Sequence, residues 1–368
     1  MELQLEGLQG IDQWGVSNKR PFIIAGPCSA ETEEQLMDTA TQLKNIGQKV
    51  IRAGIWKPRT RPGTFEGIGV QGLKWVERAK KELDVKFAVE VANAEHVELC
   101  LKYGVDILWI GARSTVNPFT VQDIADALKG SDVPVLIKNP INPDLSLWVG
   151  AIERVYNAGV RKLGAIHRGF AFHQKTRYRN VPMWNLAIEL KHLIHDLPMI
   201  CDPSHITGKR DMIQEVSQQA LDLSFDGLII ESHRDPDQAW SDASQQVTPS
   251  RLKEILDSLQ VRSTRSDDAH FQHILEEIRD QIDHADKEIL QAIANRMNLS
   301  DKIGEYKKEK NVTVLQLDRW EQILESRTTW GKGMNLDANF VEDFLKGIHN
   351  ESIRRQEEIM NQANATSK

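Results

Sequence analysis

Short apolar runs alternate with longer amphipathic segments between residue 22 and about residue 259. Segments of helical period follow the runs, as at 31–46, 65–83, 94–103 and 145–158. Continuous apolar strands alternating with helices are typical of a parallel sheet that is covered on both faces. The eight predicted strands are 22–26, 50–56, 87–92, 107–111, 134–138, 162–167, 198–201 and 227–231.

Eight such repeats in about 240 residues predict an α/β fold of the (β/α)8 TIM-barrel type. The alternative is an open, doubly wound sheet, which usually carries a glycine-rich phosphate loop after its first strand. Here that position reads Ala25-Gly26-Pro27-Cys28-Ser29, in which the proline and the cysteine fit poorly. The pattern therefore favours the closed barrel.

The pattern changes after residue 259, and no strand signal remains. We expect a barrel domain at 1–262, a polar linker at 263–268 and an all-α three-helix domain at 269–368. Its first helix runs for about 40 residues without proline, ~60 Å at 1.5 Å per residue. The shorter helices are predicted at 315–329 and 337–362, separated by residues 330–333. A tail of this size cannot bury so long a helix alone, so we expect it to form a homodimer.

Composition sets limits on the function. A net charge of −7 argues against broad nucleic-acid binding. Three cysteines form no disulfide framework and fit a reducing compartment. The first residues resemble no signal peptide, and no apolar run approaches the ~20 residues of a membrane helix. These features predict a soluble, cytoplasmic protein that binds neither nucleic acid nor membranes.

Polar residues gather where the predicted strands end, which is where the chemistry of a barrel takes place. One group combines a thiol, an imidazole and two carboxylates. Together these ligands suit a divalent transition metal such as Mn, Fe, Co or Zn better than Mg or Ca. The residues are Cys28, His205, Glu231 and Asp242.

A second group at the strand ends is cationic. Surface lysines and arginines usually lie on solvated helix faces, but these directly follow apolar strands. They predict substrates that carry phosphate and carboxylate groups. The residues are Arg52, Lys57, Arg59, Arg113, Lys138 and Arg168.

Four separated motifs carry a resemblance to a known family: Gly26-Pro27-Cys28-Ser29-Ala30-Glu31, Lys57-Pro58-Arg59-Thr60, Asp202-Pro203-Ser204-His205, and the interval from Glu231 to Asp242. Residues 10–262 resemble 3-deoxy-D-arabino-heptulosonate 7-phosphate (DAHP) synthase of the short-barrel bacterial subtype. The related 3-deoxy-octulosonate 8-phosphate synthase is the nearest competitor. The motif that begins at Lys57 favours the DAHP enzyme.

The resemblance implies condensation of phosphoenolpyruvate with erythrose 4-phosphate, the first step of the shikimate pathway. It implies a metal, with Mn the first candidate, held by Cys28, His205, Glu231 and Asp242. Our hypothesis is that Lys57 donates a proton to the developing alkoxide. Erythrose 4-phosphate is assigned to Arg59, Thr60 and Asp202. Phosphoenolpyruvate is assigned to Arg52, Lys57, Arg113, Lys138 and Arg168.

Three cations accompany the apolar stripe of the long helix. Arg296 and Lys307 are about three turns apart and share a face, ~16 Å from each other. Arg279 lies ~25 Å from Arg296 and about 100° round the helix, so only an antiparallel partner helix brings an Arg279 to the same pocket. Helix cations are usually solvated, and the residues alone leave that reading open.

The tail resembles the all-helical chorismate mutase family over residues 274–362. The matching frame contains Ile278-Arg279-Asp280-Gln281-Ile282-Asp283, Asn295-Arg296, Tyr306-Lys307, Asp318-Arg319, Ser352 and Gln356. The resemblance implies rearrangement of chorismate to prephenate without a nucleophile. It assigns the substrate carboxylates to Arg296, Arg319 and the partner's Arg279. Lys307 and Gln356 address the ether oxygen, and Ser352 lines the pocket.

This chain departs from the family where acidic residues usually face the substrate hydroxyl, because it has Gln316 and Trp320 there. Two alternatives to a bifunctional enzyme follow. The tail of a synthase can act mainly as a dimerising, ligand-sensing regulatory module, or the tail can be a plain coiled coil. The fusion also suggests allosteric regulation of the barrel by a ligand of the helical domain, such as prephenate.

Overall fold

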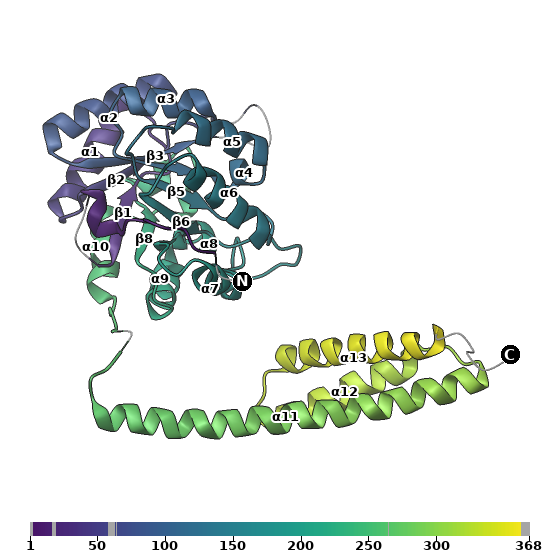
Figure 1. Cartoon of the computed structure of the whole chain (residues 1–368). Helices are drawn as coiled ribbons and strands as arrows, with labels where there is room; N and C mark the ends of the chain where they lie inside the picture. The colour runs from purple at the N-terminus through teal and green to yellow at the C-terminus, as the bar shows by residue number, and fades with distance from the viewer. Residues whose placement is uncertain (1–2, 17–19, 58–62, 64, 264, 362–368) are drawn as a thin grey trace. The chain divides into compact units, whose positions relative to one another are not determined.

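The computed structural model describes residues 3–16, 20–57, 63, 65–263 and 265–361. The chain divides into two compact units, residues 1–264 and residues 265–368 (Figure 1). The first is a closed barrel of eight parallel strands, each paired with its neighbours in sequence and β1 paired with β8. The predicted (β/α)8 barrel is confirmed, and the open sheet is excluded.

The strands lie where the apolar runs predicted them, most with slightly shorter bounds. The second run is the largest departure, since its strand ends at Ala53 and the chain continues as a loop through Trp56. The strands are β1 (Phe22–Gly26), β2 (Val50–Ala53), β3 (Lys86–Val91), β4 (Ile107–Ile110), β5 (Val135–Lys138), β6 (Leu163–His167), β7 (Met199–Cys201) and β8 (Gly227–Glu231).

Helices surround the barrel and cover the outward faces of the strands (Figure 1). Several begin at a side-chain cap, as when Thr32 accepts a hydrogen bond from the backbone N–H of Gln35. The helices are α1 (Glu33–Asn45), α2 (Val70–Leu83), α3 (Ala94–Lys102), α4 (Ala112–Thr115), α5 (Pro118–Ala127), α6 (Leu145–Asn157), α7 (Trp184–Leu193), α8 (Pro203–Thr207), α9 (Ile213–Asp222) and α10 (Pro249–Ser258).

Alternate strand residues fill the inside of the barrel, because successive side chains of a strand point to opposite faces. Phe22 and Ile24 pack inside, whereas Ala25 belongs to the layer between strands and helices. The short helix Ile11–Trp14 supplies Trp14, whose ring packs edge-on against Phe22 at 6.3 Å. The inner core is therefore filled by side chains up to the level of the strand ends.

The second unit is helical throughout its described residues: α11 (Ala269–Lys310), α12 (Leu317–Gly333) and α13 (Ala338–Asn361). Asp268 caps the start of α11, and Asn311 ends it in a left-handed conformation. At 1.5 Å per residue the helix is about 63 Å long. The prediction of an all-helical second unit is confirmed.

The predicted break at residues 330–333 is wrong, because α12 continues through Gly333. Glycine has a packing role here. A Cβ on Gly331 would lie 2.6 Å from Cγ2 of Val341, so the glycine lets α13 approach α12 closely. The chain instead turns between Met334 and Asp337.

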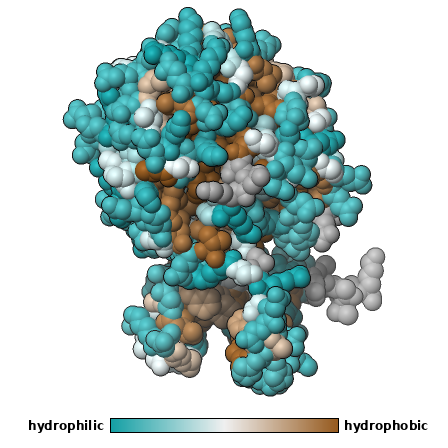
Figure 2. Space-filling view, turned by 90° about the vertical axis from the view of Figure 1, so that its left-hand side faces the viewer, coloured by the Kyte–Doolittle hydropathy of each residue, from teal (hydrophilic) through white to brown (hydrophobic). Residues whose placement is uncertain are grey.

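The first half of α11 lacks cover from the described residues of its own chain. Phe271, Ile278, Ile282 and Ile289 are each about half exposed. Contacts between α11 and α13 lie further along, as at Arg296 with Ser352 and Ser300 with Gln356. Figure 2 shows apolar side chains, in brown and tan, at the surface of the helical unit. No described helix is both long and apolar enough to cross a membrane.

Candidate functional site

The strand alternation decides which polar side chains enter the barrel mouth. Val50, Leu136 and Ile229 point inward, and the residues two positions later are Arg52, Lys138 and Glu231. In the same way, Arg168 lies two positions after the inward-pointing Ile166, and Asp202 lies two positions after Ile200. The inward apolar positions therefore end in a ring of charged side chains at the carboxyl ends of the strands.

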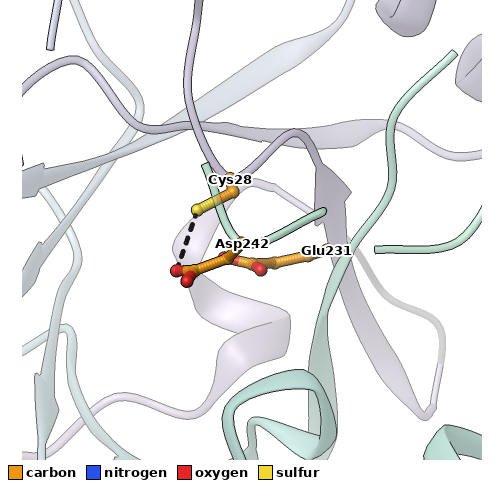
Figure 3. A group of neighbouring side chains, drawn as sticks. All are labelled: Cys28, Glu231 and Asp242. Carbon is orange, nitrogen blue, oxygen red and sulfur yellow. Dashed lines mark hydrogen bonds between the residues drawn. The ribbon is translucent and has the colours of Figure 1, made fainter. Parts of the chain in front are cut away.

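Three of the four predicted metal ligands form a compact group, shown in Figure 3. One ligand atom each from Cys28, Glu231 and Asp242 lies within 4.8 Å of the others. The Cys28 Sγ lies 3.5 Å from Oδ2 of Asp242. His205 is not part of this group, but its Nε2 lies 3.8 Å from Oε1 of Glu231.

Burial and neighbouring charges decide the protonation of this group. Burial, aided by the negative charge of Glu231, raises the pKa of the Cys28 thiol to about 11. Burial would also raise the pKa of the two carboxylates, but interactions with neighbouring basic side chains lower it by more. Arg52 and His205 lower the pKa of Glu231, and Arg179 and His205 lower that of Asp242 to about 2.

These residues fit a divalent cation. A buried thiol and two ionised carboxylates lie together, and these are groups that bind divalent transition metals. Oε1 of Glu231 is buried and lies 3.0 Å from Arg52, yet it has no hydrogen bond of good geometry within the described chain. His205 directs Nδ1 to Asp202, which orients its Nε2 toward Glu231 as in a ligand held by an outer carboxylate.

The cationic group stands beside this cluster. Arg52 is almost wholly buried and pairs with Glu231 through Nη2 only. Its Nε and Nη1 have no hydrogen-bond partner among the described residues. A buried guanidinium with two unused donors is a preformed anion site.

Trp109, which is buried in the inner core, supports two of these cations, and no motif in the sequence indicated this role. Its ring lies 5.2 Å from the Arg52 guanidinium and 5.7 Å from the Lys138 ammonium. Its Nε1 donates to Glu90 at 2.9 Å. The aromatic face thus stabilises both cations by cation–π attraction.

Lys57 contacts the thiol directly. Its Nζ donates to the carbonyl of Cys28 and lies 3.0 Å from the Cys28 Sγ. Arg168 donates to Oδ1 of Asn180 at 2.8 Å, and burial lowers the pKa of its guanidinium to about 10. Arg113 is exposed in α4. Arg59 and Thr60 lie outside the described residues.

Asp202 is buried between two other site residues. It accepts from Lys138 Nζ at 2.8 Å and lies 3.0 Å from His205 Nδ1. Burial alone would raise its pKa, but His205 and Lys138 hold the pKa well below its usual value. Its predicted contact with erythrose 4-phosphate stays a prediction, and the structure adds that it orients His205 and Lys138.

His167 illustrates a residue that ends a strand without facing the mouth. It follows Ile166 and points outward into a cage formed by Trp148, Phe170, Trp184 and Phe225. Burial lowers the pKa of its imidazole to about 3. It is therefore a neutral core histidine at physiological pH.

Four of the six predicted site residues in the helical unit take part in three hydrogen bonds within it. Arg296 donates to Oγ of Ser352 at 2.7 Å, and Gln356 Nε2 donates to Ser300 at 2.9 Å while its own Oε1 has no partner among the described residues. Lys307 Nζ donates to the carbonyl of Val314 at 2.5 Å, and burial lowers its pKa.

The other two predicted residues stand apart. Arg279 and Arg319 are exposed, and Arg319 has a weak contact of 3.4 Å with Gln322. His349 was missed by the sequence analysis. It lies three residues before Ser352 on α13 and stacks on Trp320 with ring centroids 3.9 Å apart. Its pKa is lowered by burial, and then by Arg296 and Lys307.

Comparison with known proteins decides the family. The DAHP synthetase I family matches residues 13–266, and the chorismate mutase type II family matches residues 278–357. The chain belongs to the DAHP synthetase I family. Its helical unit is a chorismate mutase domain, so two enzyme domains are fused in the order that the sequence analysis predicted.

Relatives agree with this assignment. A phospho-2-dehydro-3-deoxyheptonate aldolase of Thermotoga maritima is 32% identical over 237 residues, which cover 64% of this chain and 68% of that protein. A 2-dehydro-3-deoxyphosphooctonate aldolase of Albidiferax ferrireducens is 28% identical over 277 residues, 66% of this chain and 90% of that protein.

Solved structures match the barrel. The crystal structure of the Thermotoga maritima DAHP synthase aligns with a TM-score of 0.59 at 31% identity, covering 66% of this chain and 69% of that one. A truncated form of the DAHP synthase from the same organism aligns with a TM-score of 0.57 at 28% identity, covering 66% and 86%. The deoxyheptonate aldolase is more similar to this chain, at 32% identity, than the deoxyphosphooctonate aldolase, at 28%.

Proposed function

We propose that the barrel condenses phosphoenolpyruvate with erythrose 4-phosphate to DAHP and phosphate, and that the helical domain rearranges chorismate to prephenate. The family of each domain supports these reactions. The observation that carries the first is the buried cluster of Cys28, Glu231 and Asp242 beside Arg52 with its two unused donors.

A divalent transition metal, Mn first among the candidates, would be held by Cys28, His205, Glu231 and Asp242, and as a Lewis acid it would polarise the aldehyde of erythrose 4-phosphate. The thiolate is the form that binds a metal, so loading releases the Cys28 proton. The protein's part is to hold these ligands rigidly and to keep the site buried.

The cationic side chains of the mouth bind the two substrates. Arg52, Lys138 and Arg168 bind the phosphate and carboxylate of phosphoenolpyruvate, with Arg113 at the exposed rim. Charge-assisted bonds in a buried site hold the enol carbon against the aldehyde. Arg59 and Thr60 remain our assignment for erythrose 4-phosphate.

Lys57 is our candidate proton donor to the alkoxide that forms when the new carbon–carbon bond closes. Its Nζ lies at the metal cluster, 3.0 Å from the Cys28 Sγ. The Lys57→Met variant should lose at least about 100-fold in kcat, within the range for a missing general acid. A variant that keeps its kcat and only raises the KM of phosphoenolpyruvate would limit Lys57 to binding.

In the helical domain, Arg296 and Arg319 with the partner's Arg279 bind the carboxylates of chorismate, while Lys307 and Gln356 stabilise charge on the ether oxygen. The exposed first half of α11 supports the homodimer that this requires. Chorismate consumption by the full-length protein should be lost in Arg296→Ala. Absence of turnover in the unmodified protein would instead favour a dimerising, ligand-sensing domain.

A further inference from the structure

Two side chains outside the predicted ligand set join the two metal-binding carboxylates. Arg179 lies in the segment between β6 and α7, and Gln245 follows Asp242 by three residues. Nη1 of Arg179 donates to Oδ1 of Asp242 at 3.1 Å and to Oε1 of Gln245 at 2.6 Å. Nε2 of Gln245 then donates to Oε2 of Glu231 at 2.6 Å.

This chain of bonds occupies one oxygen of each carboxylate. Arg179 holds Oδ1 of Asp242, whereas Oδ2 faces the Cys28 Sγ at 3.5 Å. Gln245 holds Oε2 of Glu231, whereas Oε1 faces Nε2 of His205 at 3.8 Å. Outside the chain of bonds, the predicted ligands form two close pairs of atoms, Sγ with Oδ2 and Nε2 with Oε1, and Oε1 also pairs with Arg52.

Glutamine suits this position because its amide both accepts and donates. Gln245 is completely buried, so its two hydrogen bonds satisfy an amide that water does not reach. The backbone of Arg179 is fixed as well, because its N–H donates to the carbonyl of Ile206 at 3.0 Å. A hydrogen bond thus holds the backbone of Arg179, whose side chain contacts Asp242 directly and Glu231 only through Gln245.

We propose that Arg179 and Gln245 are a positioning pair that sets the spacing and orientation of Glu231 and Asp242 for the metal. The inference rests on the proposed function, since it takes the cluster as the metal site. Neither residue touches substrate in this account. Their role is to keep two ionised carboxylates close enough together to share one cation.

The test uses full-length protein stripped of metal by a chelator and titrated with Mn²⁺ against a chromophoric competitor. Gln245→Met keeps the size of the side chain and removes both hydrogen bonds. We expect it to bind Mn²⁺ 10- to 100-fold more weakly, the usual effect of losing such an outer contact. Arg179→Met should weaken binding to a similar extent, and the double variant should be little worse than either single one, because the pair acts as a unit.

A matched control exists on the outside of the barrel. Gln122 on α5 accepts from Arg154 and donates to Asp126, so it forms the same arginine–glutamine–carboxylate chain away from the cluster. Gln122→Met should bind Mn²⁺ like the unmodified protein. Co²⁺ supplies a second signature, in which the thiolate charge-transfer band of Cys28 persists in Gln245→Met while the d–d bands shift.

The outcomes are separable. If the unmodified protein binds no divalent metal, the metal-dependent function fails. If it binds Mn²⁺ and Gln245→Met binds within twofold of it, the positioning role is overturned. Should Gln245→Met not fold, Arg179→Met decides, because it removes the Nη1 that donates both bonds. Its Mn²⁺ affinity should fall 10- to 100-fold, and an unchanged affinity would refute the pair.

Discussion

Asp202→Asn removes the charge that pairs with Lys138 and with Nδ1 of His205 beside the proposed metal site. The variant keeps an oxygen that can accept from the backbone N–H of His205, as Asp202 does at 3.1 Å. It removes the charge that pairs with Lys138 at 2.8 Å, and both side chains are almost completely buried. Lys138 is then left as a buried ammonium without its counterion.

The expected cost follows from this burial. Removing one partner of a buried pair destabilises a protein by about 3–5 kcal/mol. The ring of Trp109, 5.7 Å from Lys138, offsets about 1 kcal/mol of this. We therefore expect the barrel to lose about 2–4 kcal/mol, which is roughly 5–15 °C in Tm for a domain of this size.

The assay is thermal unfolding of metal-free full-length protein, followed by near-UV circular dichroism. Lys138→Met and the double variant complete a double-mutant cycle. Because the double variant has no unpaired charge, it should be more stable than the sum of the single losses predicts. A loss below about 1 kcal/mol for Asp202→Asn, or exact additivity in the cycle, would refute the argument.

Three further predictions test other parts of the molecule. Burial lowers the pKa of His167 from 6.5 to about 3, so stability is fully present above pH 6.5 and falls as the pH drops toward 3. Between pH 7 and pH 5 this should cost about 2 kcal/mol of unfolding free energy, a slope that His167→Phe should lack in urea titrations at both pH values. Gly331→Ala should destabilise the helical domain by about 1–3 kcal/mol through its clash with Val341, whereas Gly333→Ala, which meets open space, should be neutral or slightly stabilising in thermal melts. Ser352→Ala removes the hydroxyl that holds Arg296 and should lower the kcat/KM of chorismate turnover about tenfold, and an unchanged value would separate Ser352 from the site.

The strand pattern was predictable because parallel strands buried on both faces are continuous apolar runs. Their bounds were harder to place. The run at 50–56 continues past Ala53 into the loop that carries Lys57, and apolar character alone does not distinguish the two. The glycines at 331 and 333 predicted a break, but a glycine that permits close helix packing has the same local sequence as one that ends a helix.

The charged residues at the mouth were predictable from their place after apolar runs. The strand alternation gives the reason, since Arg52, Lys138 and Glu231 each lie two positions after an inward apolar residue. Arg179 and Gln245 left no comparable signal. They lie in segments without a periodic pattern, and only the folded barrel brings Arg179 to Asp242 and Gln245 to Glu231. His349 likewise depends on how α13 meets Trp320.

The most direct test of the account measures both reactions in one sample of full-length protein before and after removal of metal. We predict that chelation abolishes consumption of phosphoenolpyruvate with erythrose 4-phosphate and that added Mn²⁺ restores it. Chorismate turnover should be unchanged throughout, because the helical domain uses only charge and shape. Synthase activity that persists without metal, or a protein that never converts chorismate, would contradict the account.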